Sequence, residues 1–211
     1  MRDIYLLSGL GADKSVFNFI DLSGFNANHI EWVNPAENEQ IENYAKRLSK
    51  QIQTDNPIVI GVSFGGIMAI EIAKLVKTEK IIVISSVKTK HEIPIYFRFM
   101  GYIKIHRLIP IRFFKQVNRL TYWFFGIKTK NEKELLMTII KKTDTNFLRW
   151  AIDKIVNWQN TTRFPNLVHI HGTDDKIFPL KTADYKVYNG GHLMVINKGE
   201  ELAALIRKIL S

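Results

Sequence analysis

The first candidate for chemistry is a serine, Ser63, which has a glycine two positions before it and another two positions after it. It follows the apolar run 58–60 and precedes apolar residues that are spaced as on a helix. A chain that turns this sharply from strand to helix strains the serine backbone, and a side chain at either flank would collide with the neighbouring strand or helix. The amide N–H groups at the start of the helix would point toward developing negative charge. The pattern predicts a nucleophilic serine.

A serine hydroxyl is a weak nucleophile until a base takes its proton. His192 is the predicted base among the six histidines, because it follows Gly190 and Gly191 in a turn between the last predicted strand and the last predicted helix. Glycines in that turn let the loop carry an imidazole over the carboxyl edge of a sheet. We interpret His171 as structural, and the remaining histidines have no supporting context: His29, His91, His106 and His169.

The imidazole in turn needs a carboxylate that orients it and stabilises its cation. Asp174 and Asp175 follow a predicted strand directly. One of two adjacent aspartates in a turn is usually there for turn geometry. We favour Asp175 as the acid and keep Asp174 as the alternative.

A tetrahedral oxyanion needs donors that are already in place. The glycines of Gly9-Leu10-Gly11, just after the first predicted strand, would leave backbone N–H groups unobstructed. The predicted pair of donors is the amide of Leu10 and that of Phe64, the residue after the nucleophile.

Apolar runs predict the elements that must carry these residues. Strands are expected at Ile4–Leu7, His29–Val33, Ile58–Ile60, Ile81–Ile84, Leu167–Ile170 and, more weakly, Tyr185–Tyr188, with helices through Ile41–Ile52, Ile67–Ala73 and Leu202–Ile209. Alternating strands and helices, with strands that are continuously apolar, are typical of a parallel sheet covered on both faces.

Residues 88–160 interrupt this alternation and have the pattern of several helices. One predicted helix face carries Phe113, Val117, Leu120 and Phe124, and Asn131 with Glu134 predicts an N-terminal cap. From Lys88 to Arg163 there are sixteen Lys and Arg but only five Asp and Glu, and thirteen of the 24 aromatic residues. The predicted organisation is a nearly neutral core, residues 1–87 and 161–211, with a basic, aromatic helical insertion between its two parts.

Composition excludes several other classes of protein. With 211 residues of which 46% are hydrophobic, the chain can bury the core of one ordinary domain, so disorder is excluded. It contains no cysteine, which rules out disulfides, thiolate nucleophiles and cysteine-based metal sites. No apolar stretch is long enough to span a bilayer or to serve as the core of a signal peptide. We expect a cytoplasmic protein.

Four motifs together resemble the α/β-hydrolase superfamily. Residues 8–11 resemble its H-G-x-G oxyanion motif, residues 61–65 its G-x-S-x-G, residues 172–179 its G-x-x-D-x-x-x-P acid loop, and residues 190–192 its G-H turn. The resemblance covers the chain outside the insertion, although Ser8 stands where the family commonly has histidine. It implies a reduced α/β-hydrolase fold of about six parallel strands in local order 2-1-3-4-5-6, without the usual N-terminal hairpin, and with helices on both faces and an inserted helical lid.

The resemblance also implies a serine hydrolase that cleaves a carboxylic ester or thioester through an acyl-enzyme. Ser63 would attack, His192 would carry the proton, and Asp175 would orient His192; no cofactor or metal is expected. One alternative keeps the triad but hydrolyses a C–C bond or eliminates a leaving group. The other is a non-catalytic binding protein on the same fold.

The charge of the insertion leaves three interpretations open. Arg112, Lys115 and Arg119 lie at helical spacing beside aromatic residues. They could form a solvated basic face, contact an anionic membrane surface, or dock an acidic group such as a CoA-linked substrate or an acidic carrier protein. Nucleic acid is not expected as a partner, because no binding motif accompanies the charge.

Overall fold

The computed structural model describes residues 1–211 and contains one six-stranded parallel sheet in the order β2-β1-β3-β4-β5-β6. This confirms the predicted α/β fold class and strand order. The strands are β1 (Arg2–Leu7), β2 (Phe25–His29), β3 (Ile58–Val62), β4 (Lys80–Ile84), β5 (Leu167–Gly172) and β6 (Tyr185–Val187). All neighbouring strands pair in parallel, so their carboxyl ends share one edge of the sheet.

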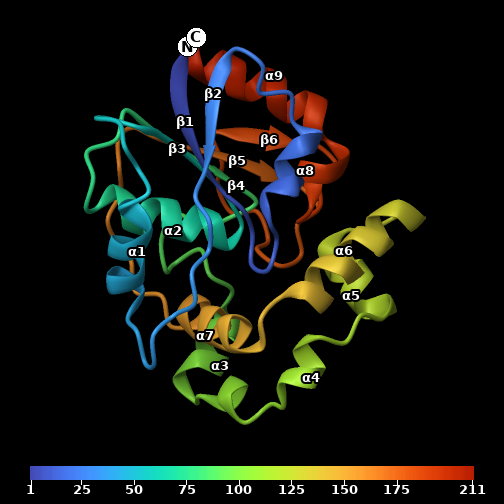
Figure 1. Ribbon diagram of the computed structural model, residues 1–211. Helices are drawn as coiled ribbons and strands as arrows, with labels where there is room; N and C mark the ends of the chain where they lie inside the picture. Colours follow the sequence, from blue (N-terminus) through green and yellow to red (C-terminus); the bar gives the residue numbers. More distant parts are fainter.

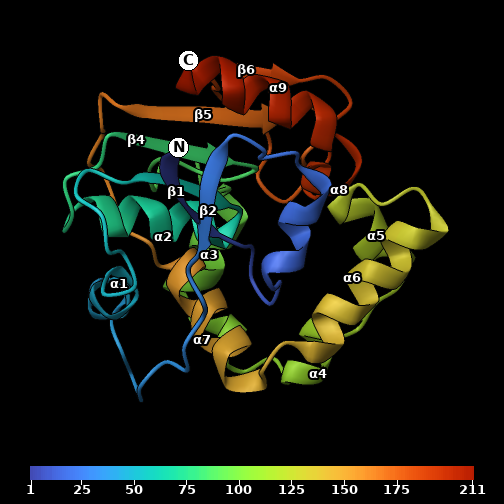
Figure 2. The same cartoon turned by 45° about the horizontal axis from the view of Figure 1, so that its top comes forward.

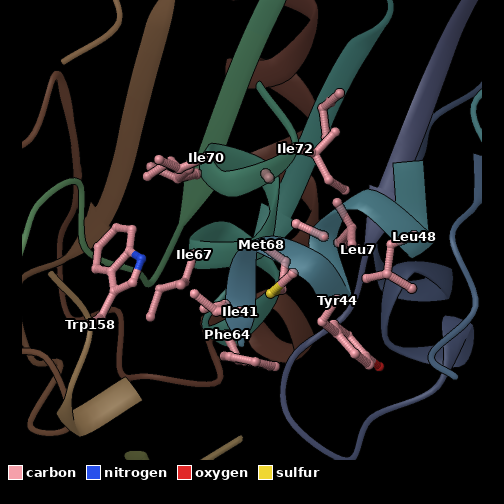
Figure 3. Close-up of a cluster of buried hydrophobic side chains, with 14 of the residues drawn as sticks. Leu7, Ile41, Tyr44, Leu48, Phe64, Ile67, Met68, Ile70, Ile72 and Trp158 are labelled. Atoms are coloured by element: carbon pink, nitrogen blue, oxygen red, sulfur yellow. The ribbon is translucent and has the colours of Figure 1, made fainter. Parts of the chain in front are cut away.

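Helices cover both faces of this sheet (Figures 1 and 2). One layer holds α1 (Ile41–Ser49), α2 (Phe64–Ala73) and part of the insertion, and the other holds α8 (Met194–Asn197), α9 (Gly199–Leu210) and the 3₁₀ helix η1 (Lys14–Phe19). Each layer has its own hydrophobic core, of 24 and 19 buried residues respectively. Figure 3 shows the first core, in which α1 and α2 place Tyr44, Leu48, Phe64 and Met68 beside Leu7 of β1. All ten residues of α2 are buried.

The second strand was predicted too late in the chain. It spans Phe25–His29 rather than His29–Val33, and Ile30 only extends its pairing by donating a hydrogen bond to the carbonyl of Leu6. This strand lies at the sheet edge, where its side chains are mostly exposed or half-buried, so its sequence lacks the apolar run of the central strands.

The insertion is helical, but two of the helices within it begin at other residues than predicted. It contains α3 (Ile95–Tyr102), the 3₁₀ turn η2 (Ile105–Arg107), α4 (Ile111–Phe114), α5 (Arg119–Phe125), α6 (Lys130–Lys142) and α7 (Thr145–Val156). The single helix predicted through Phe113 and Phe124 is two helices, because the Asn118 side chain caps α5 by accepting hydrogen bonds from two backbone amides. The cap of α6 is Thr129 with Glu132, not Asn131 with Glu134.

No helix in the structure is both long and apolar enough to cross a membrane.

Candidate active site

Ser63 lies in a sharp turn between β3 and α2. Its backbone has φ 54° and ψ −118°, a conformation that a residue with a side chain seldom adopts. A Cβ atom on Gly61 would lie 2.2 Å from the carbonyl oxygen of Gly65, and one on Gly65 would lie 2.3 Å from the carbonyl oxygens of Leu7 and Ser8. Both glycines are therefore required for the helix and the two strands to approach one another this closely.

The structure brings Ser63, His192 and Asp175 together in one hydrogen-bonded chain. The Ser63 Oγ lies 2.8 Å from His192 Nε2, and His192 Nδ1 lies 2.9 Å from Asp175 Oδ2. An ionised carboxylate only accepts hydrogen bonds, so His192 Nδ1 carries the proton and Nε2 is left to accept the serine proton. The three residues follow β3, β6 and β5 respectively, and thus meet at the carboxyl edge of the sheet.

Two glycines allow the loops after β5 and β6 to touch. A Cβ atom on Gly172 would lie 2.2 Å from the carbonyl oxygen of Gly190. The backbone amide of Asp174 donates to that same carbonyl, while the Asp174 side chain is exposed and accepts a hydrogen bond only from Thr173. Of the two aspartates, Asp175 is the one in contact with His192.

The carboxylate of Asp175 is buried and has hydrogen-bond donors around both oxygens. Oδ1 accepts from the backbone amides of Ile177 and Phe178, each at 2.9 Å. Oδ2 faces His192 and also lies 3.3 Å from His171 Nε2. Burial alone would raise the pKa of Asp175, but attraction to His192 and the hydrogen bonds from His171 and His192 outweigh it and hold this pKa well below its usual range.

Behind Asp175 lies a pair of buried histidines, His169 and His171, neither of which was predicted to belong to the site. His171 Nε2 donates to the carbonyl of Phe178 at 2.7 Å, which leaves its Nδ1 to accept from His169 Nε2 at 2.8 Å. His169 Nδ1 is then a buried acceptor without a partner. Burial, with the charges of His171 and Lys88, lowers the pKa of His169 to about 3. The signal in the sequence was the two-residue spacing, which places both rings on one face of β5.

His169 should make the free energy of unfolding depend on pH. Because its pKa falls from 6.5 to about 3 on folding, the unfolded chain binds a proton below pH 6.5 that the native state does not bind. Stability is therefore lost as the pH falls below that value. The variant His169→Gln keeps a hydrogen-bond donor for His171 but has no group that titrates. Between about pH 7 and about pH 5.5, the free energy of unfolding of the wild type should fall by roughly 1 kcal/mol more than that of His169→Gln. Urea unfolding at the two pH values measures this, and equal losses would refute it.

Two backbone amides near Ser63 have no acceptor. The amide of Leu10 donates no hydrogen bond, and Phe64 is the first residue of α2, where an amide has no partner within the helix. The turn that carries Leu10 is held by Ser8, whose hydroxyl donates to the carbonyl of Ala12 and accepts from the indole of Trp32. These two hydrogen bonds of Ser8 stabilise the turn after β1.

A cavity of about 330 Å³ opens beside Ser63 and His192. Twenty of its 26 lining residues are hydrophobic, and the insertion supplies many of them, including Phe97, Phe125 and Ile152. Apart from His192, the lining contains no ionisable side chain; its other polar side chains are amides and hydroxyls. No group of three or more His, Asp or Glu side chains is arranged to hold a metal ion.

The insertion also touches the loop of His192 directly. Gly126, at the end of α5, has φ 71°, and a Cβ atom there would lie 2.9 Å from the Cα of Gly191. The amide of Leu193 donates to the carbonyl of Phe125, and the Phe125 ring meets the His192 ring edge-on at 5.7 Å. A displacement of α5 would therefore be transmitted to His192.

The chain resembles known proteins in its three-dimensional structure but not in its sequence. No protein-family model matches the sequence, and no curated protein matches it either. A lipase-esterase related protein from Clostridium acetobutylicum is 14% identical over 99% of this chain and 94% of its own, with a TM-score of 0.69. A thermophilic esterase from Thermogutta terrifontis is 15% identical over 100% and 89%, with a TM-score of 0.66. The 2-hydroxy-6-oxo-6-phenylhexa-2,4-dienoate hydrolase of a Rhodococcus strain is 13% identical over 99% and 90%, with a TM-score of 0.65. With its strand order and these structural relatives, the chain has the α/β-hydrolase fold.

Proposed function

We propose that the protein is a serine hydrolase that cleaves carboxylic esters or thioesters with an uncharged, apolar acyl group. The observation that carries this proposal is the hydrogen-bonded chain from Ser63 through His192 to Asp175, which opens onto an apolar cavity. A hydroxyl next to an oriented imidazole is the arrangement that nucleophilic catalysis requires.

In the first half of the reaction, the Ser63 Oγ attacks the substrate carbonyl carbon while His192 Nε2 takes the hydroxyl proton. The negative charge moves to the carbonyl oxygen, where the amides of Leu10 and Phe64 donate hydrogen bonds to it; one such donor lowers the barrier by about 3 kcal/mol. His192 then gives its proton to the departing alcohol or thiol. The product of this half is an ester between the acyl group and Ser63.

In the second half, water replaces the leaving group and attacks the acyl-enzyme. His192 Nε2 takes a proton from the water, and after the second tetrahedral intermediate collapses it returns that proton to the Ser63 oxygen. The carboxylic acid leaves and the serine is restored. Throughout, the ionised Asp175 holds His192 in the right tautomer and stabilises its cationic form, and the helical insertion acts as a lid that supplies the walls of the acyl site.

A fluorophosphonate probe tests the nucleophile without knowledge of the substrate. The folded wild type should gain one phosphonyl group, and peptide mapping should locate it on Ser63. Ser63→Ala should not react, whereas Ser49→Ala, which removes a hydroxyl on the distant α1, should react like the wild type. A folded wild type that stays unlabelled, or a Ser63→Ala protein that labels equally, would refute the proposal.

The lining of the cavity predicts discrimination against charged acyl groups. A p-nitrophenyl ester of hexanoate should be hydrolysed with kcat/KM at least about 100-fold higher than the mono-ester of adipate, because the adipate carboxylate would be buried where no Lys or Arg side chain faces it. The two acyl chains have the same length, so their comparison isolates the charge. Steady-state kinetics measures the ratio, and equal or faster cleavage of the adipate ester would contradict the assignment.

A further inference from the structure

Exposed apolar side chains gather on one part of the helical insertion. Fourteen large hydrophobic side chains of the protein are exposed, and ten of them lie between residues 95 and 123. These ten are Ile95, Tyr96, Phe99, Tyr102, Ile103, Ile105, Leu108, Phe113, Leu120 and Trp123. Tyr102 and Leu108 are 84% and 81% exposed. A protein that remains surrounded by water rarely concentrates such groups in one region, so this region is expected to contact a partner.

The same region carries positive charge with nothing to balance it. Residues 93–131 contain eight Lys and Arg and no Asp or Glu. Among the cations between residues 95 and 123, the range that holds the ten apolar side chains, four are exposed and form no ion pair: Arg98, Lys104, Arg112 and Arg119. Arg107, by contrast, pairs with Asp153. We call the ten apolar side chains and the four unpaired cations the cationic apolar face.

The cationic apolar face lies on the outside of the molecule. Figure 1 shows α3 and α4 at the end of the molecule opposite the two chain termini, and Figure 2 shows α4 at the same far end. The helix α5, which carries Arg119, Leu120 and Trp123, lies to one side of them, next to α6. The ten apolar side chains are between 41% and 84% exposed, although the Lys176 ammonium lies over the ring of Trp123.

From this combination we propose that the cationic apolar face docks the protein on an anionic lipid membrane. Aromatic and aliphatic side chains enter the boundary between headgroups and acyl chains, while Lys and Arg bind the lipid phosphates beside them. The long stems of Lys and Arg suit this arrangement, because they lie along apolar surface and keep the charge at the polar level.

Two other partners fit the face less well. A symmetric pair of copies would bring the four cations of each copy into one interface, and their mutual repulsion would oppose association. Nucleic acid would satisfy the cations but would leave ten apolar side chains against phosphates. An anionic bilayer satisfies both kinds of group at once.

The face is continuous with the cavity beside Ser63. Phe113 is 51% exposed on the face and also lines the cavity, and the exposed Gln116 of the following loop lines it too. A protein docked through this face would turn that side of its cavity toward the lipid. An apolar substrate dissolved in the membrane could then reach Ser63 with less exposure to water.

Binding to vesicles of known composition tests the docking without any assay of activity. The wild type should sediment with vesicles of phosphatidylcholine mixed with phosphatidylglycerol, and much less with phosphatidylcholine alone. Each cation at an anionic surface favours binding about fivefold. Raising the salt from about 0.1 M to about 1 M should remove most of the difference between the two lipids.

Two variants with four substitutions each test whether binding depends on where the cations lie or only on the net charge. Changing Arg98, Lys104, Arg112 and Arg119 together to Gln should weaken binding by roughly 600-fold, the product of four fivefold effects. Changing Lys14, Lys46, Lys50 and Lys186 to Gln removes the same charge from exposed positions outside the face and should change binding only a few-fold.

A second pair tests the apolar contribution. Tyr102→Ser with Leu108→Ser should weaken binding about 10-fold or more, whereas Tyr188→Ser with Leu75→Ser, exposed residues of the same two types outside the face, should not. Thermal melting checks that each variant is folded. The proposal is overturned if the wild type ignores anionic vesicles, if both members of either pair bind alike, or if ultracentrifugation shows that the face instead joins two copies.

Discussion

Asp175→Asn is expected to lower kcat for ester hydrolysis by about 10⁴-fold, the effect of giving the base of a serine triad the wrong tautomer. The hydrogen bonds around Asp175 determine the orientation of the new amide. The backbone amides of Ile177 and Phe178 both donate to Oδ1 of Asp175, so the amide oxygen of asparagine would take that position and its NH₂ group would face His192. His192 Nδ1 would then have to accept, its Nε2 would carry the proton, and Ser63 would have no base.

The neighbouring residue provides a matched control. Asp174→Asn makes the same chemical change one position earlier, on an exposed side chain that does not contact His192, and should alter kcat less than about threefold. Steady-state kinetics on one ester, with circular dichroism to check the fold, measures both. A comparable loss in the two variants, or a larger loss in Asp174→Asn, would show that the carboxylate has been assigned to the wrong residue.

The three side chains that meet at the candidate site could be singled out in the sequence because each depends on its local sequence. Glycines mark the turns that carry Ser63 and His192, and the acid follows an apolar strand within a few residues. The shared edge of a parallel sheet then brings these distant turns together, so correct strand order was sufficient to place them. The sequence favoured Asp175 but left Asp174 open, and only the contact of the Asp175 carboxylate with His192, which depends on tertiary packing, separates the two.

Other features could not be read from the chain because they depend on tertiary contacts. The cavity is formed where side chains of separate insertion helices meet the core, and no local pattern gives its volume or its lack of charge. The edge strand β2 owes its place to pairing with β1, since its own residues are largely polar. The caps at Asn118 and Thr129, in contrast, follow known local rules, and the T-x-x-E pattern at Thr129 was available in the sequence.

Gly65→Ala is expected to cost on the order of 3 kcal/mol in the free energy of unfolding. The added Cβ would lie 2.3 Å from the carbonyl oxygens of Leu7 and Ser8. Both obstacles are backbone atoms, so the collision cannot be relieved by rotating a side chain, and either α2 or the end of β1 must move. The first movement displaces Ser63 and the second displaces the turn that carries Leu10, so kcat should also fall by about 100-fold or more.

Gly9→Ala is the matched control, because it makes the same substitution beside the same serine where there is room. Its Cβ would lie 3.6 Å from the Cβ of Ser63, an ordinary contact, and Gly9 does not have a positive φ. Its free energy of unfolding should stay within about 1 kcal/mol of the wild type. Urea unfolding of both variants measures the contrast. Equal stabilities would mean that α2 can retreat from β1 without loss, and that Gly65 is not required by the close approach of these backbones.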